Sequence, residues 1–172
     1  MVVEVRRARP DELDAVGELT VRAYAAFTLG PADPYIERLR DAAARAEGAE
    51  LWVAAHGDRL LGNVTYCPPG SAYREVSRPD EGEFRMLAVD PDARGSGAGT
   101  ALAAHCEERA REHGAVGMAI SSLAEMTDAH RIYTRLGYAR DPGRDWSPLP
   151  GVELVAFSKG GDPAAGGRHR SQ

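Results

Sequence analysis

The feature that most constrains the fold is a glycine-rich turn between a strand pattern and a helix pattern. The turn covers residues 94–100 with the sequence RGSGAGT, after the apolar run 84–89 and before the helix-like run 101–112. Backbone N–H groups converge where such a turn opens a helix, and the helix dipole adds about half a positive charge. The segment therefore predicts a site for a pyrophosphate or a similar anion, with Arg94 adding a charge-assisted hydrogen bond from the rim.

Composition limits the class of protein. The 172 residues suffice for one domain with a full core, and 43% hydrophobic and 27% charged residues are ordinary for a soluble globular protein. The net charge of -5 argues against a nucleic-acid partner. No apolar run approaches the ~18 residues of a membrane span, and residues 1–14 lack the apolar core of a signal peptide. We therefore expect a cytoplasmic protein with no membrane partner.

Cysteine, histidine and lysine usage excludes further classes. Cys67 and Cys106 form no CxxC pair, so a disulfide framework is not expected and a reducing compartment fits better. The five histidines show no metal-ligand spacing, so no metal site is expected. Lys159 is the only lysine among 21 lysine and arginine residues, so guanidinium groups must carry the cationic contacts.

Strand and helix patterns follow one another in the order β-α-α-β-β-β-α-β-α-β-β. The second helix is expected over about residues 34–47, and a Pro/Gly loop is expected after the strand that begins at 138–140. The short connections within 51–89 predict antiparallel strands, and the helix after the glycine turn predicts a parallel crossover. The expected fold class is α/β (α+β), with a mixed, mostly antiparallel central sheet of about six to seven strands and flanking helices. One domain over 1–159 is expected, followed by a disordered tail over 160–172 that is rich in Gly, Ala and Arg.

An adjacent apolar pair interrupts the alternation of the strand over 83–89. Phe84 and Met86 set one phase, and Leu87 and Val89 set the other. A β-bulge produces this pattern and would splay the strand from its neighbour. A strand buried on both faces produces it as well, so both interpretations stay open.

Two motifs resemble the GNAT acetyltransferase superfamily. Residues 83–102, EFRMLAVDPDARGSGAGTAL, match its strand followed by Arg/Gln-x-x-Gly-x-Gly/Ala at Arg94, Gly97 and Gly99. Residues 129–138, AHRIYTRLGY, match its Ala-x-x-x-Tyr-x-x-x-Gly-Phe/Tyr. The element order agrees over about residues 2–159. The resemblance implies an acetyl-CoA-dependent N-acetyltransferase that acetylates a primary amine of a small molecule or peptide by direct attack, with no metal.

The resemblance also implies roles for individual residues. It places acetyl-CoA between the strands at 83–89 and 115–121, with the pyrophosphate on the glycine-turn amides and the pantetheine arm along the first strand. The implied cofactor-binding residues are Leu87, Ala88, Val89, Arg94, Gly95, Ser96, Gly97, Ala98, Gly99 and Thr100. Many members carry an Asn that contacts the pantetheine arm where this chain has Met126, which puts that contact in doubt.

Tyr133 and Glu83 are the candidate catalytic residues. Acetyl transfer needs a neutral amine, donors for the oxyanion and a proton for the leaving thiolate. Tyr133 would protonate the thiolate, although its place on an apolar stripe also fits a core residue. Glu83 would act as the base through water, although an ion pair with Arg85 on the same face would make it structural. The N–H of Leu87 or Val89 would stabilise the oxyanion.

Other functions remain as alternatives. A P-loop needs Gly-Lys-Ser/Thr and a Rossmann fingerprint needs a third Gly where Leu102 stands, so nucleotide-binding enzymes fit poorly. A non-catalytic CoA-binding or regulatory module on the same fold stays open, as does transfer of a different acyl group. A homodimer stays open too, and the sequence does not identify the acceptor.

Overall fold

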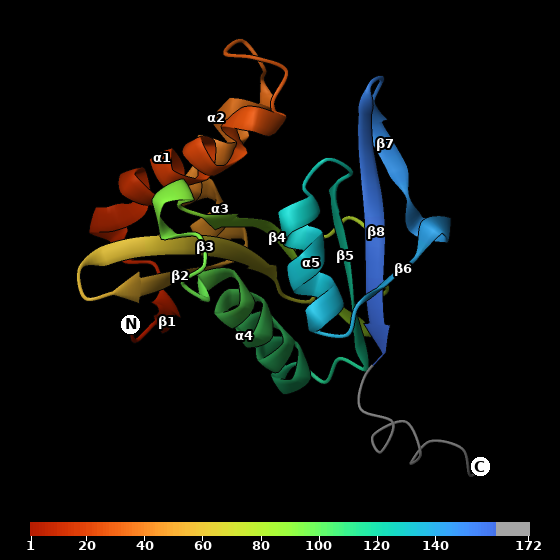
Figure 1. The fold of residues 1–172 in the computed structure, drawn as a ribbon. Coiled ribbons are helices and arrows are strands. Elements are labelled where there is room, and N and C mark those ends of the chain that lie inside the picture. The colour runs from red at the N-terminus through yellow and green to blue at the C-terminus, as the bar shows by residue number, and fades with distance from the viewer. Residues whose placement is uncertain (161–172) are drawn as a thin grey trace.

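The computed structural model describes residues 1–160 (Figure 1). Within that range its strands are β1 (Glu4–Arg7), β2 (Glu50–His56), β3 (Arg59–Cys67), β4 (Glu81–Val89), β5 (Gly117–Leu123), β6 (Ala139–Arg140), β7 (Trp146–Leu149) and β8 (Val152–Gly160). The helices are α1 (Leu13–Tyr24), α2 (Tyr35–Arg40), α3 (Ala42–Gly48), α4 (Ala98–Glu112) and α5 (Thr127–Arg135). Gly160 ends β8, and the rest of the tail expected to be disordered lies outside the described residues.

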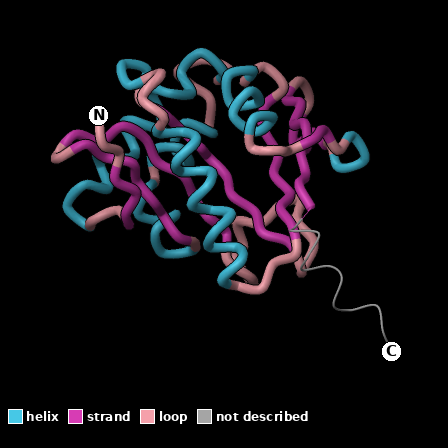
Figure 2. The backbone as a smooth tube through the Cα atoms, turned by 60° about the horizontal axis from the view of Figure 1, so that its bottom comes forward, coloured by secondary structure: helices cyan, strands magenta, loops and turns pink. Residues whose placement is uncertain are grey.

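The strands form one sheet in the order β1-β2-β3-β4-β5-β8-β6, with β7 paired to β8. Only β4 and β5 pair in parallel among these strands, which confirms the mixed, mostly antiparallel sheet. Helices flank the strands on both sides (Figure 2). On one face α4 and α5 bury residues such as Leu102 and Tyr133. On the other face α1, α2 and α3 bury residues such as Val16, Leu39 and Ala42.

Two elements differ from the sequence prediction. The helix expected over 34–47 is split at Asp41, whose carboxylate accepts the Ala44 N–H at 3.0 Å and caps α3. The loop expected after β6 contains β7, so the described sheet has eight strands rather than six or seven. Pro148 lies within β7. Proline has no N–H to donate and occurs in strands mainly at sheet edges, so its presence argued against a strand in the sequence.

A β-bulge interrupts β4 at the adjacent apolar pair. Asn63 of β3 lies opposite Ala88 and Thr65 lies opposite Arg85, so Val64 faces both Met86 and Leu87. Met86 has a φ of 54°, the only positive value at a non-glycine residue in the described chain. The structure therefore shows the bulge, and it also buries Met86 and Leu87 against opposite faces of the sheet.

The bulge lies where the sheet opens. The parallel pairing of β4 with β5 is confined to Glu81–Gly117 and Gly82–Met118, at the start of both strands. Beyond these pairs the two strands diverge, and α5 lies across the gap (Figure 1). The divergence leaves room between the strand ends, beside the glycine turn that follows β4.

The described chain has two further features that bear on its class. Cys67 and Cys106 are free and buried. None of the helices within residues 1–160 combines the length and the hydropathy that a membrane span requires.

Candidate active site

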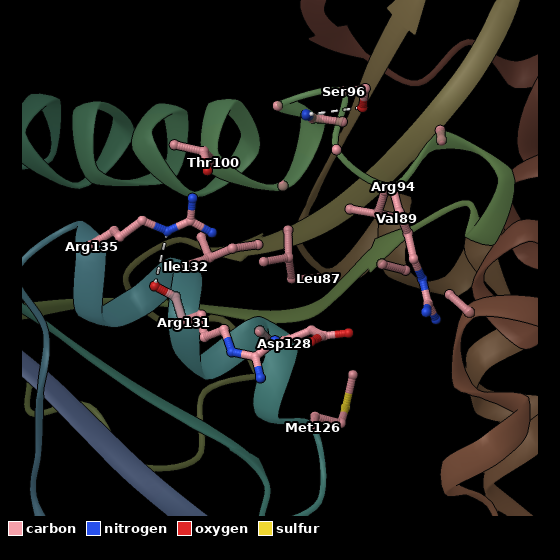
Figure 3. A pocket seen from close by; sticks show the side chains of 18 of the residues that line it. Leu87, Val89, Arg94, Ser96, Thr100, Met126, Asp128, Arg131, Ile132 and Arg135 are labelled. Carbon is pink, nitrogen blue, oxygen red and sulfur yellow. Dashed lines mark hydrogen bonds and ion pairs between the residues drawn. The ribbon is translucent and has the colours of Figure 1, made fainter.

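A cavity of about 380 Å³ opens where β4 and β5 part (Figure 3). From the end of β4 and the glycine turn, it is lined by all ten residues expected to contact a cofactor: Leu87, Ala88, Val89, Arg94, Gly95, Ser96, Gly97, Ala98, Gly99 and Thr100. The opposite wall comes from α5 and the residue before it, and includes Met126, Ile132 and Arg135. Ala23 and Phe27 close the end nearest α1.

The glycine turn offers unpaired backbone donors to this cavity. Gly95 and Gly97 have φ values of 81° and 86°, which place both in the left-handed region that favours glycine. A Cβ atom at either position would meet no heavy atom within 4 Å, so the space beside the turn is open. The N–H groups of Gly97, Gly99 and Thr100 have no acceptor within the described chain. With the N-terminus of α4, they form a seat for an anion.

Arginine side chains surround the opening. Arg94 lies on one side, whereas Arg135 extends from α5 towards Thr100 on the other (Figure 3). Arg131 lies one turn before Arg135 and pairs with Asp128 at 2.7 Å. Neither Arg94 nor Arg135 has a carboxylate partner among residues 1–160. The cavity therefore combines free amides with guanidinium groups that pair with no carboxylate of residues 1–160, which suits a ligand that carries several negative charges.

Tyr133 belongs to α5, and its side chain packs in the core. It is not among the residues that line the cavity. Its ring centroid lies 5.9 Å from that of Phe84 on β4 and 5.5 Å from that of Phe157 on β8. The side chain is 4% exposed, and burial raises the pKa of its phenol, so the hydroxyl keeps its proton at neutral pH. This environment suits a core residue and also suits a proton donor.

Two polar residues next to Tyr133 were missed from the sequence. A hydrogen bond with Ser122 on β5 favours the ionised phenol and opposes the effect of burial on the Tyr133 pKa. His130 Nε2 lies 3.2 Å from Ser122 Oγ and 3.1 Å from the Leu123 carbonyl oxygen. Burial lowers the pKa of His130. Its position three residues before Tyr133, on the same side of a helix, was the available signal.

Glu83 is held by a loop rather than presented to the cavity. Its side chain is fully buried, and its carboxylate accepts the backbone N–H groups of Glu75, Val76 and Ser77 at 2.9–3.1 Å. The ion pair considered between Glu83 and Arg85 is wrong, because Arg85 Nε pairs with Glu75 at 2.6 Å. The structure thus gives Glu83 a structural task, the anchoring of residues 75–77.

Comparison with known proteins identifies the family. Residues 13–138 match the model of the acetyltransferase (GNAT) family. The chain belongs to the GNAT family. Mycothiol acetyltransferase of Cellulomonas flavigena is 33% identical over 158 residues, which is 83% of this chain and 44% of the relative. Aminoalkylphosphonate N-acetyltransferase of Salmonella typhimurium is 44% identical over 57 residues, 33% of this chain and 37% of the relative. The chain thus matches less than half the length of either protein.

Solved structures show the same GNAT fold. yncA from Salmonella typhimurium, solved with its cofactor acetyl-CoA, has a TM-score of 0.66 and 18% identity, and the match covers 94% of this chain and 95% of that one. PaiA N-acetyltransferase from Thermoplasma acidophilum, in complex with coenzyme A, has a TM-score of 0.68 and 15% identity, with coverage of 93% and 99%. At these identities the likeness establishes the fold.

Two further features of the site concern Met126 and possible metal ligands. Met126, which stands where many members carry an Asn, lines the cavity immediately before α5. Its thioether offers no N–H donor, so the cavity lacks an amide at this point. Within residues 1–160 no three His, Cys, Asp or Glu side chains gather as a metal site would require.

Proposed function

We propose that this GNAT protein is an N-acetyltransferase that moves an acetyl group from acetyl-CoA to a primary amine of a small molecule or peptide by direct attack. The observation that carries the proposal is the set of free N–H groups at Gly97, Gly99 and Thr100, which face a cavity beside a bulged strand. A phosphate anion fits such donors, and the neighbouring arginines balance its charge.

Different residues of the cavity would bind different parts of the proposed cosubstrate. The amides of the glycine turn and Arg94 would hold its pyrophosphate, and Arg135 would hold its remaining phosphate. The exposed edge of β4 at Leu87, Ala88 and Val89 would align the pantetheine arm, because β5 has already turned away from it. Bound acetyl-CoA would supply the activated acetyl thioester.

The chain's own residues would then assist the transfer. A backbone N–H at the bulge, on Leu87 or Val89, would stabilise the negative charge that develops on the carbonyl oxygen. Tyr133 would donate a proton to the departing thiolate, since its phenol is protonated at neutral pH. Ser122, which contacts both His130 and the phenol, would return a proton to Tyr133 afterwards. Glu83 as a base through water stays a prediction, and its anchoring contacts oppose that role.

The first test is calorimetric titration of the purified chain with acetyl-CoA, followed by measurement of thiol release with a panel of amines. Binding together with amine-dependent thiol release supports the proposal. Binding without thiol release favours the non-catalytic CoA-binding module, and faster release from propionyl-CoA favours a different acyl group. Absence of binding at millimolar acetyl-CoA would refute the cofactor assignment and the activity together.

The relatives suggest two acceptor classes for that panel. One relative is named for mycothiol and the other for aminoalkylphosphonates, which are amines with an anionic group. Because the chain matches less than half of either protein, we propose both only as starting points for the screen.

A further inference from the structure

A second cluster of charged side chains lies on the face of β4 that is turned away from α4. Met86 and Ala88 pack on this face with Tyr24 and Leu39, whereas Phe84 packs on the opposite face. Residues on either side of Phe84 along the strand point away from it, so Glu83 and Arg85 share the face of Met86. Ala88 also lines the cavity, so the cluster adjoins the proposed acetyl site.

The centre of this cluster is an ion pair within reach of solvent. Arg85 Nε lies 2.6 Å from Glu75 Oε1, with side-chain exposures of 14% and 19%. Arg85 Nη1 also donates to the Tyr73 carbonyl oxygen at 3.2 Å. Burial raises the pKa of Glu75, whereas the charge of Arg85 lowers it. Both groups are therefore partly desolvated yet accessible, and each can contact a small solute.

Glu83 explains why Glu75 stands opposite Arg85. Its buried carboxylate accepts the N–H groups of residues 75–77 and fixes the backbone from which the Glu75 side chain projects. In a loop without helix or strand, such contacts decide the position of a side chain. Glu83 is thus a positioning residue for the Glu75–Arg85 pair.

The same face carries the buried guanidinium of Arg45, which hydrogen-bonds to no carboxylate of residues 1–160. Arg45 is 1% exposed, and its Nε has no hydrogen-bond partner among the residues that the structure describes. Its other nitrogens donate to neutral oxygens: Asn63 Oδ1 and Thr65 Oγ1 at 3.1 Å, Leu39 O at 2.9 Å and Thr20 Oγ1 at 3.4 Å. Burial raises the pKa values of Tyr24 and Tyr35, whereas the positive charges of Arg45 and Arg85 lower them. The electrostatic field of both guanidinium groups therefore reaches these phenols. On this face Arg45 and Arg85 stand opposite Glu75 and Glu83, and the Glu83 carboxylate is taken up by the N–H groups of residues 75–77.

We propose that the acceptor is an amine that also carries an anionic group, recognised by Arg85 through the anion and by Glu75 through the ammonium. This inference rests on the proposed acetyl transfer. In the free protein Arg85 and Glu75 neutralise each other. A zwitterion would give Arg85 an anion and Glu75 an ammonium group as new partners, and the net charge of the site would not change. An amine without an anion would engage Glu75 but add positive charge beside Arg85 and Arg45.

The inference is tested by thiol release at saturating acetyl-CoA with propylamine, spermidine, β-alanine and 2-aminoethylphosphonate. We expect kcat/KM for the better of the two anionic amines to exceed that for propylamine and spermidine by about tenfold or more, the worth of one charge-assisted contact. R85Q is expected to bring the ratio near one and R85K to restore part of it. R40Q is the matched control, since Arg40 pairs with Glu18 and Glu37 on the outer surface.

The outcomes separate this inference from the proposed function. A preference for propylamine or spermidine, or an unchanged ratio in R85Q that unfolds at the wild-type temperature, overturns the inference and leaves the acetyltransferase in place. If acetyl-CoA binds but no amine of a broad panel releases thiol, the proposed function itself fails. E75Q gives a second check, because a raised KM for every amine with a retained kcat is expected if Glu75 holds the ammonium.

Discussion

The Ser77 N–H donates a hydrogen bond of 2.9 Å to Glu83 Oε1, across six positions of the chain. The same carboxylate takes the N–H groups of Glu75 and Val76, so one buried side chain satisfies three successive amides of a loop. Buried donors that lose their acceptor cost free energy, so this contact couples the stability of the loop to β4.

Replacing Glu83 distinguishes an anchor from a general base. In Glu83→Gln an NH₂ group faces backbone donors, so we expect the free energy of unfolding to fall by about 1–3 kcal/mol and the acceptor KM to rise. The pH dependence of kcat is expected to stay unchanged. Denaturant unfolding and pH–rate profiles provide the measurements. A kcat at least 100-fold lower with a lost acid limb and normal stability would instead assign the base to Glu83. Glu108→Gln, at an exposed position of α4, serves as the control.

Replacing Tyr133 tests whether its phenol is the general acid that protonates the leaving thiolate. Tyr133→Phe keeps the ring that packs between Phe84 and Phe157 and removes the hydroxyl alone. If the phenol protonates the thiolate, we expect turnover to fall by about 10²-fold or more while CoA affinity changes little. Steady-state kinetics and calorimetry measure the two. Tyr138→Phe, in the same aromatic cluster, is expected to retain turnover. Wild-type turnover in Tyr133→Phe would make Tyr133 a core residue only.

A valine at Gly97 tests the anion seat. Gly97 and Gly114 have similar φ values of 86° and 80°, and a Cβ at either would meet no heavy atom within 4 Å. Valine at either position is therefore expected to cost a similar amount of stability, about 1–2 kcal/mol from the left-handed backbone. Only Gly97→Val places methyl groups beside the free amides, so only this variant is expected to lose CoA affinity in calorimetry. Equal affinities in the two variants would contradict the seat.

The sequence could predict the glycine turn because its geometry is local. Left-handed glycines followed at once by a helix specify both the turn and its free amides, and these need no distant partner. The bulge was recognisable for a similar reason, as the phase change at Met86 and Leu87 lies within one strand. Only pairing with Val64 could decide between the bulge and a doubly buried strand.

The environment of Glu83 could not be predicted, because its partners come from a loop rich in Pro, Gly and Ser. The return of residues 75–77 over β4 has no periodic signal, so nothing in the sequence separated an anchor from a base. Arg135 escaped notice for a related reason. Its distance from the glycine turn depends on how α5 packs against α4, which is a tertiary relationship.

The position of Arg135 in the cavity lining leads to a prediction about the phosphate groups of the cosubstrate. If it binds the phosphate that coenzyme A carries outside its diphosphate, Arg135→Ala should weaken CoA binding by about tenfold, a typical value for one charge-assisted contact. Binding of dephospho-CoA should hardly change. Calorimetric titration with both ligands measures the difference. Arg111→Ala, on α4 but outside the cavity lining, should bind both as the wild type does. Equal losses for both ligands in Arg135→Ala would place the contact on the diphosphate instead.

Two half-buried histidines lead to a prediction of how stability depends on pH. Burial lowers the folded-state pKa of His130 and of His105 below the unfolded value of about 6.5. The unfolded chain therefore binds more protons than the folded chain just below pH 6.5, so the free energy of unfolding should fall as the pH is lowered from 7 towards 5. Urea unfolding at several pH values measures this slope. His130→Gln removes one titrating group and should make the slope shallower, and the doubly substituted H105Q/H130Q chain should make it shallower again. A slope that is identical in wild type and in His130→Gln would show that His130 titrates alike in both states.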